Sequence, residues 1–182
     1  MALIFQHIPT ENTDKASFLD IGTGSGCIAL ALKQRYLTAH VHALDVCPKA
    51  LAIAEKNSKM HGLSLSLREC DILELNEWEG GKLKYIVSNP PYIPPSERPI
   101  MAQTTLSYEP KLALFVDEND PLIFYRHIGL LGQIALLSKG EIWVECGFTQ
   151  GNDVAQLFEG QGYATSIYKD SSGVNRFVRA IK

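Results

Sequence analysis

Short apolar runs alternate with longer stretches of mixed apolar and polar residues along most of the chain. Apolar or alternating runs of about four to eight residues predict strands, and longer stretches with apolar residues every three or four positions predict helices. The predicted strands are residues 17–21, 40–44, 63–70, 83–88, 141–146, 164–169 and 176–181. The predicted helices are residues 27–36, 48–61, about 121–138 and 152–160. Ahead of them, residues 2–8 predict a helical remnant that is followed by a polar loop.

The order of these elements predicts the fold class. Strands that alternate with helices predict a mainly parallel, doubly wound α/β sheet. The last two strands have no helix between them, so we expect an antiparallel hairpin at one edge of the sheet. The Pro-rich segment at 89–119 is too long for an ordinary connection, which makes it a candidate binding loop.

Composition narrows the class of protein. The 182 residues are 46% hydrophobic and 20% charged, which is typical of one soluble globular domain. The net charge of −3 argues against a nucleic-acid binder that relies on bulk electrostatics. We find no apolar stretch near the roughly 18 residues that span a bilayer, and no signal peptide, so we expect a cytoplasmic protein without a membrane partner.

Cysteine and histidine spacing gives no sign of a metal site. None of the four cysteines forms a Cys-x-x-Cys pair, so we expect reduced and largely buried thiols. The five histidines are scattered without metal-ligand spacing, and we assign them no role.

A glycine-rich turn follows the first predicted strand. Asp20-Ile21-Gly22-Thr23-Gly24-Ser25-Gly26 leaves that strand and opens the first helix. Glycines let the main chain approach a ligand closely, and a helix N-terminus offers free N–H groups to an anion. The third glycine comes one residue earlier than in a dinucleotide motif, which favours a ligand with a carboxylate and no pyrophosphate.

Two further carboxylates end neighbouring strands. Asp45 ends the second strand, where a carboxylate can accept both hydroxyls of a ribose. Asp71 follows the third strand, within reach of an adenine amino group. A tight turn beside two surface acids would also produce this pattern, but three acids at three strand ends favour a nucleoside site.

The sharpest motif is Asn89-Pro90-Pro91-Tyr92, directly after the fourth strand. The two prolines make the main chain stiff and extended. The Asn89 side-chain oxygen and the Pro90 carbonyl can then converge on one planar NH2 group, with Tyr92 as a flat wall against it. An amide or exocyclic amine nitrogen is a poor nucleophile, and two acceptors favour its pyramidal form and stabilise the charge it develops.

With these motifs in view, the chain resembles the release-factor glutamine methyltransferases of the HemK/PrmC family. The resemblance runs from Phe18 to Lys182 and is carried by residues 19–30, 88–93, 108–115, 124–126, 169–170 and 173–179. The Asn-Pro-Pro-Tyr tetrad is shared with adenine-N6 methyltransferases, whereas Glu109-Pro110-Lys111-Leu112-Ala113-Leu114 is more specific to glutamine methylation.

The resemblance implies a seven-stranded class I fold with S-adenosyl-L-methionine as methyl donor and S-adenosyl-L-homocysteine as product. The implied substrate is the glutamine of the Gly-Gly-Gln motif in peptide chain release factors, a partner in translation termination. The implied cofactor-binding residues are Asp20, Gly22, Thr23, Gly24, Gly26, Asp45, Asp71 and Asn89. The implied substrate residues are Asn89, Pro90, Pro91 and Tyr92, of which Asn89, Pro90 and Tyr92 are expected to be catalytic.

The front of the chain departs from that family. Its members carry a helical domain and a Pro-Arg-Pro-Glu-Thr-Glu segment ahead of the catalytic domain, and residues 1–17 resemble neither. We therefore expect residues 1–17 to be a leader and residues 18–182 the catalytic domain, in a fragment of a longer protein or a truncated relative.

Three other functions stay open at this stage. The motifs fit a methyltransferase for a glutamine of a ribosomal protein equally well. An adenine-N6 methyltransferase of nucleic acid is disfavoured by the acidic pI and by the lack of a basic or aromatic track. A non-catalytic module that only binds S-adenosylmethionine is disfavoured by the intact tetrad.

Overall fold

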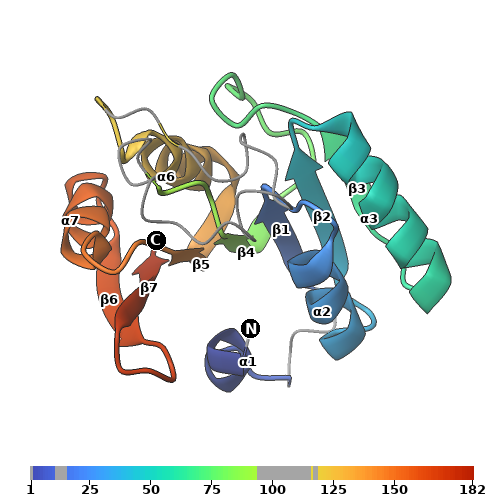
Figure 1. The fold of residues 1–182 in the computed structure, drawn as a ribbon, viewed down its shortest axis with the longest axis horizontal. Coiled ribbons are helices and arrows are strands. Elements are labelled where there is room, and N and C mark those ends of the chain that lie inside the picture. Colours follow the sequence, from blue (N-terminus) through green and yellow to red (C-terminus); the bar gives the residue numbers. More distant parts are fainter. Residues whose placement is uncertain (1, 11–15, 94–115, 117–118) are drawn as a thin grey trace, which may run out of the picture.

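The structure is a computed structural model that describes residues 2–10, 16–93, 116 and 119–182 (Figure 1). Its strands are β1 (Ser17–Ile21), β2 (His40–Asp45), β3 (Ser66–Glu69), β4 (Leu83–Ser88), β5 (Leu136–Glu145), β6 (Ala164–Lys169) and β7 (Asn175–Ile181). Its helices are α1 (Ala2–His7), α2 (Cys27–Arg35), α3 (Pro48–His61), α6 (Ile123–Ala135) and α7 (Gly151–Gly160).

The strands form a seven-stranded sheet in the order β3-β2-β1-β4-β5-β7-β6. The pairs among the first five strands of this order are parallel, and β7 pairs antiparallel with both β5 and β6. The predicted doubly wound sheet with an antiparallel C-terminal hairpin is therefore confirmed. Within that hairpin, the last strand in sequence lies inside the sheet and β6 forms the edge.

Two apolar cores cover the two faces of the sheet. Alternate residues of a strand point to opposite faces, so Phe18 and Leu19 belong to different cores. One core packs α6 and α7 against the sheet, with the fully buried Phe158 among its members. The other packs α1 and α2 against the opposite face, and Figure 1 shows these two groups of helices well apart. Because β1, β2 and β4 are covered from both sides, their carboxyl ends are held rigidly.

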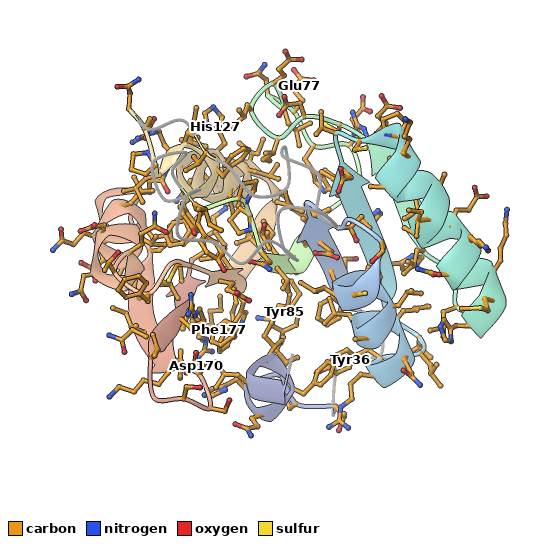
Figure 2. The ribbon with its side chains drawn as sticks, in the orientation of Figure 1. Tyr36, Glu77, Tyr85, His127, Asp170 and Phe177 are labelled. Atoms are coloured by element: carbon orange, nitrogen blue, oxygen red, sulfur yellow. The ribbon has the colours of Figure 1, made fainter. Side chains whose placement is uncertain are left out.

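Helix α1 is part of the second core. Ile4 and Ile8 are buried, and the Tyr36 hydroxyl donates to the Ile8 carbonyl at 2.9 Å. Tyr36 and Tyr85, both labelled in Figure 2, stack on Phe18 with ring centroids 5.1 and 4.9 Å away. Residues 3–8 thus include side chains that pack on the sheet, and the predicted boundary at residue 17 stays a prediction.

Two predicted elements have different limits in the structure. The third strand was expected at 63–70, but only Ser66–Glu69 pairs with β2. The helix expected at 121–138 ends at Ala135, because Leu136 is already extended and pairs with Leu83. The register then moves from Leu83↔Leu136 to Tyr85↔Glu141, so residues 137–140 of β5 form a bulge in its ladder with β4. Lys139 lies in this bulge with a left-handed φ of 58°.

The four cysteines are all free thiols, as expected. Cys146 is buried, and Cys47 and Cys70 are partly buried. The prediction of burial is wrong for Cys27, which is exposed because it opens α2 next to the glycine turn. In the described part of the chain, none of the helices has the length and apolar character to cross a bilayer.

Candidate active site

The register of the sheet brings the predicted motifs to one edge. β1 lies between β2 and β4, which is the point where strand order reverses and where open α/β sheets bind ligands. Ile21 pairs with Leu44 on one side and with Ser88 on the other. The glycine turn after Ile21 therefore lies between Asp45 and the Asn89-Pro90-Pro91-Tyr92 motif.

The glycine turn folds back over β2 and leaves open space above it. The N–H groups of Gly22 and Thr23 both donate to the Leu44 carbonyl at 2.9 Å. Gly22 and Gly24 have positive φ values of 70° and 58°, and a Cβ atom on either would meet no atom within 4 Å. The positive φ values favour glycine at both positions, and contact between these glycines and a ligand stays a prediction.

Gly26 has a different role in the packing. It precedes α2 with a φ of 86°, and a Cβ atom there would lie 3.1 Å from the Ala54 Cβ atom. It therefore lets the start of α2 approach α3 closely, and direct contact between Gly26 and a cofactor stays a prediction.

Asp20 is fully buried beneath the turn. Its Oδ2 accepts hydrogen bonds from the Thr23 hydroxyl at 2.7 Å and from the Ala29 N–H at 3.0 Å, which ties the turn to the first turns of α2. Among the described residues, no partner contacts its Oδ1 atom. Burial raises the pKa of Asp20 to about 7, against the opposing effect of those two hydrogen bonds. Asp20 thus shapes the turn from below.

Asp45 points into the same region from the end of β2. Its Oδ2 accepts from the Gly24 N–H and its Oδ1 from the Cys47 N–H, both at 2.8 Å. A carboxylate has about four acceptor positions, so this fixed side chain can accept further hydrogen bonds from a ligand.

Asp71 approaches Asp45 because the Cys70 N–H donates to the Asp45 carbonyl at 3.0 Å. The Asp71 Oδ1 atom accepts from the Leu73 N–H at 2.9 Å, and the side chain is partly exposed. Asp20 is the next-to-last residue of β1, Asp45 ends β2, and Asp71 lies two residues beyond the end of β3. The three predicted acids thus lie at the carboxyl ends of three adjacent strands, with Asp20 beneath the turn and the other two beside it.

The Asn89-Pro90-Pro91-Tyr92 motif leaves β4 beside the glycine turn. The Ser88 hydroxyl donates to the Ile21 carbonyl at 2.8 Å, which locks the two strand ends together. Asn89 is exposed, Pro90 is buried, and Pro91 and Tyr92 are partly buried. The motif therefore presents a polar side chain at the surface of the site from a rigid main chain.

Sequence reasoning missed the residues that hold Tyr92. The Tyr92 hydroxyl donates to the Glu145 Oε1 atom at 3.3 Å, and the Gln150 amide donates to the Tyr92 carbonyl at 3.3 Å. Burial raises the pKa of Tyr92, and the neighbouring Glu145 carboxylate raises it further. Glu145 ends β5, so the rule that drew attention to Asp45 would have found it as well.

Most of the candidate binding loop lies outside the described residues, including the stretch at 108–115. Two described residues show where the loop returns. Val116 is buried, and its N–H donates to the Ile93 carbonyl at 3.1 Å, next to the Asn-Pro-Pro-Tyr motif.

A glycine turn after β1 and a stiff polar motif after β4, on a sheet of this order, define a Rossmann-like class I methyltransferase. Among solved structures, a methyltransferase from Pyrococcus furiosus aligns with a TM-score of 0.67 at 17% identity over 100% of this chain and 83% of its own. The family model described as "Methyltransferase small domain" matches residues 1–114. The chain belongs to this family.

Curated relatives are similar over nearly the whole chain. A release factor glutamine methyltransferase from Bacteroides thetaiotaomicron is 39% identical over 95% of this chain and 63% of its own length. A protein of the same name from Flavobacterium psychrophilum is 36% identical over 97% of this chain and 62% of its own. The chain thus spans less than two thirds of the length of these relatives.

Proposed function

We propose that this chain is a catalytic unit that transfers methyl from S-adenosylmethionine to the amide nitrogen of the glutamine in the Gly-Gly-Gln motif of release factors. The observation that carries the proposal is the pairing of Ile21 with Ser88, which puts the glycine turn and the Asn-Pro-Pro-Tyr motif side by side. A methyl donor on the first and an NH2 group on the second would meet at this junction. The similarity to two release factor glutamine methyltransferases supports glutamine as the target.

The residues present fit the proposed cofactor. The open space above Gly22 and Gly24 fits the methionine part, whose carboxylate would face the N–H groups at the start of α2. Asp45 would accept from the ribose hydroxyls, and Asp71 would lie near the adenine. Asp20, Thr23 and Gly26 would shape this cradle, and Asn89 would border it. When bound, S-adenosylmethionine supplies a methyl group activated by its sulfonium centre.

The chain's own contribution to the reaction is to hold and activate the amide. The Asn89 side-chain oxygen and the Pro90 carbonyl would each accept one hydrogen of the substrate NH2 group. This grip favours the pyramidal nitrogen and stabilises its developing positive charge, so it is stronger in the transition state than in the ground state. Tyr92 would pack against the planar amide. No base is needed before attack, because the methylated cation loses its proton readily.

One assay separates this function from its rivals. The purified chain and methyl-labelled S-adenosylmethionine are incubated in separate reactions with one of four substrates. These are a release factor, the same factor with its Gly-Gly-Gln glutamine changed to alanine, a ribosomal protein, and adenine-containing DNA. We expect label only in the release factor that keeps this glutamine. Label in another substrate would assign the site to that substrate, and binding of S-adenosylmethionine without any transfer would indicate a non-catalytic module.

The cytoplasmic location stays a prediction.

A further inference from the structure

Tyr92 is held at two points by residues from the carboxyl end of β5 and the turn after it. The Glu145 carboxylate accepts from its hydroxyl, and the Gln150 amide donates to its main-chain carbonyl, each at 3.3 Å. We call these two residues the Tyr92 clamp. Their partner lies more than fifty positions earlier in the chain, so the clamp joins the Asn-Pro-Pro-Tyr motif after β4 to the end of the neighbouring strand β5 and the turn after it.

Both members of the clamp are themselves anchored. The Glu145 carbonyl accepts from the Tyr125 hydroxyl at 3.1 Å, so the main chain at this strand end is fixed independently of the Glu145 side chain. The Gln150 Oε1 atom accepts from the Gly147 N–H at 3.0 Å, which orients its amide so that the NH2 group faces Tyr92. A clamp with anchored members can define a side-chain orientation to within the tolerance that a reacting site needs.

The motif needs such a support at Tyr92. The two prolines restrict the main chain ahead of Tyr92, but they do not restrict the rotation of its side chain. A phenol O–H prefers the plane of its ring, so a hydrogen bond from the hydroxyl to a fixed acceptor favours one ring plane, while the held main chain fixes the near end of the side chain. The ring is partly buried and packs against the core of α6 and α7, and the clamp adds two directional contacts to this packing.

We propose that Glu145 is a positioning residue of the active site, which sets the plane of Tyr92 against the substrate amide, and that Gln150 holds the main chain of Tyr92 in place. The inference rests on the proposed function. Glu145 acts through the Tyr92 hydroxyl and does not touch the reacting atoms. The raised pKa of Tyr92 keeps its proton in place at neutral pH, so the phenol stays the donor in this bond.

The test compares Glu145→Ala, Glu145→Gln, Tyr92→Phe and the double variant Glu145→Ala/Tyr92→Phe. We expect Glu145→Ala to lower kcat/KM for the release factor about fivefold, as for loss of one partly exposed hydrogen bond, with S-adenosylmethionine affinity unchanged. Glu145→Gln should restore most of the loss, because an amide oxygen still accepts from the phenol. Tyr92→Phe should cost about as much as Glu145→Ala, and the double variant no more than either. Glu55→Ala, which removes an exposed carboxylate paired with Lys59 on α3, is the matched control and should have no effect.

A spectroscopic readout tests the contact without turnover. Tyrosine labelled with ¹³C at the hydroxyl-bearing carbon gives seven NMR signals, and the one lost in Tyr92→Phe is that of Tyr92. Glu145→Ala should shift this signal, and Glu145→Gln should shift it less. An unmoved signal, or losses that add in the double variant, would overturn the inference. If the wild-type chain methylates no release factor, the proposed function fails, while the NMR shift still decides whether Glu145 orients Tyr92.

Discussion

Asp20 should make the stability of this protein fall as the pH rises from about 4 to 7. The carboxyl is fully buried, and burial raises its pKa from 3.8 to about 7. The unfolded chain loses this proton near pH 3.8, whereas the folded chain keeps it until about pH 7. The folded state therefore binds more protons between these values, so its free energy of unfolding decreases with pH. The stabilisation is fully present below about pH 3.8 and is lost as the pH passes 7.

The perturbation that isolates this effect is Asp20→Asn. An asparagine oxygen can still accept from the Thr23 hydroxyl and the Ala29 N–H, so the turn keeps its two anchors. The new NH2 group, placed where Oδ1 has no partner, adds a cost that does not depend on pH. At about 1.4 kcal/mol per pKa unit, the shift of roughly three units corresponds to about 4 kcal/mol across this range. The free energy of unfolding of the variant, relative to that of the wild type, should thus rise by up to about 4 kcal/mol between pH 4 and pH 8.

Urea unfolding of both proteins at half-unit intervals from pH 4 to pH 8 measures this difference. Every other titrating group occurs in both proteins, so the contributions of groups that do not interact with Asp20 cancel when the two curves are subtracted. The subtracted curve should rise with pH and level off above about pH 7. A flat curve would refute the reasoning, because it would mean that Asp20 ionises in the folded protein as readily as in the unfolded one.

Three further predictions test the site. Asp45→Ala should weaken S-adenosylmethionine binding by roughly tenfold to a hundredfold, because it removes charge-assisted hydrogen bonds to two hydroxyls. Unchanged affinity in calorimetry would show that Asp45 does not belong to the site. Asn89→Ala should lower methyl transfer by about a hundredfold or more with cofactor affinity nearly intact, and turnover within a few-fold of wild type would make the motif structural. Gly26→Ala should lower the free energy of unfolding, measured in urea, by about 1–2 kcal/mol, because the φ of 86° is left-handed and the new Cβ atom would press on Ala54. An unchanged free energy of unfolding would mean that α2 and α3 can move apart to accommodate the new atom.

The fold could be predicted because strand and helix periods differ and because the order of elements limits the topology. The residues at which each strand or helix begins and ends depend on neighbouring elements, which the periodicity of the sequence does not reveal. Residues 63–65 continue the apolar pattern of β3, yet only Ser66–Glu69 has a neighbouring strand to pair with. Leu136 continues the apolar pattern of α6, yet its pairing with Leu83 makes it the first residue of β5. In both places the neighbouring strand decides the boundary.

The candidate site divides in the same way. Asp45, Asp71 and Asn89 could be predicted as site residues because each lies at or just after the carboxyl end of a strand, and parallel strands bring these ends to one edge of the sheet. The support of these residues could not be predicted, since it comes from contacts between distant parts of the chain. The link between Glu145 and Tyr92 joins two strand ends, and only the register of β4 with β5 brings them together.

The position of β7 in the sheet has a consequence for biosynthesis. Among the strands that the structure describes, β7 is made last, yet it lies between β5 and β6, where Val178 pairs with Val144 on one side and with Ile167 on the other. A nascent chain that has emerged only as far as β6 therefore exposes the inner edge of β5 and has no place in the sheet for β6. The native pairing of this half of the sheet is complete only once Asn175–Ile181 has left the ribosome. A chain stopped before this strand would lose an interior strand and expose an apolar edge open to aggregation.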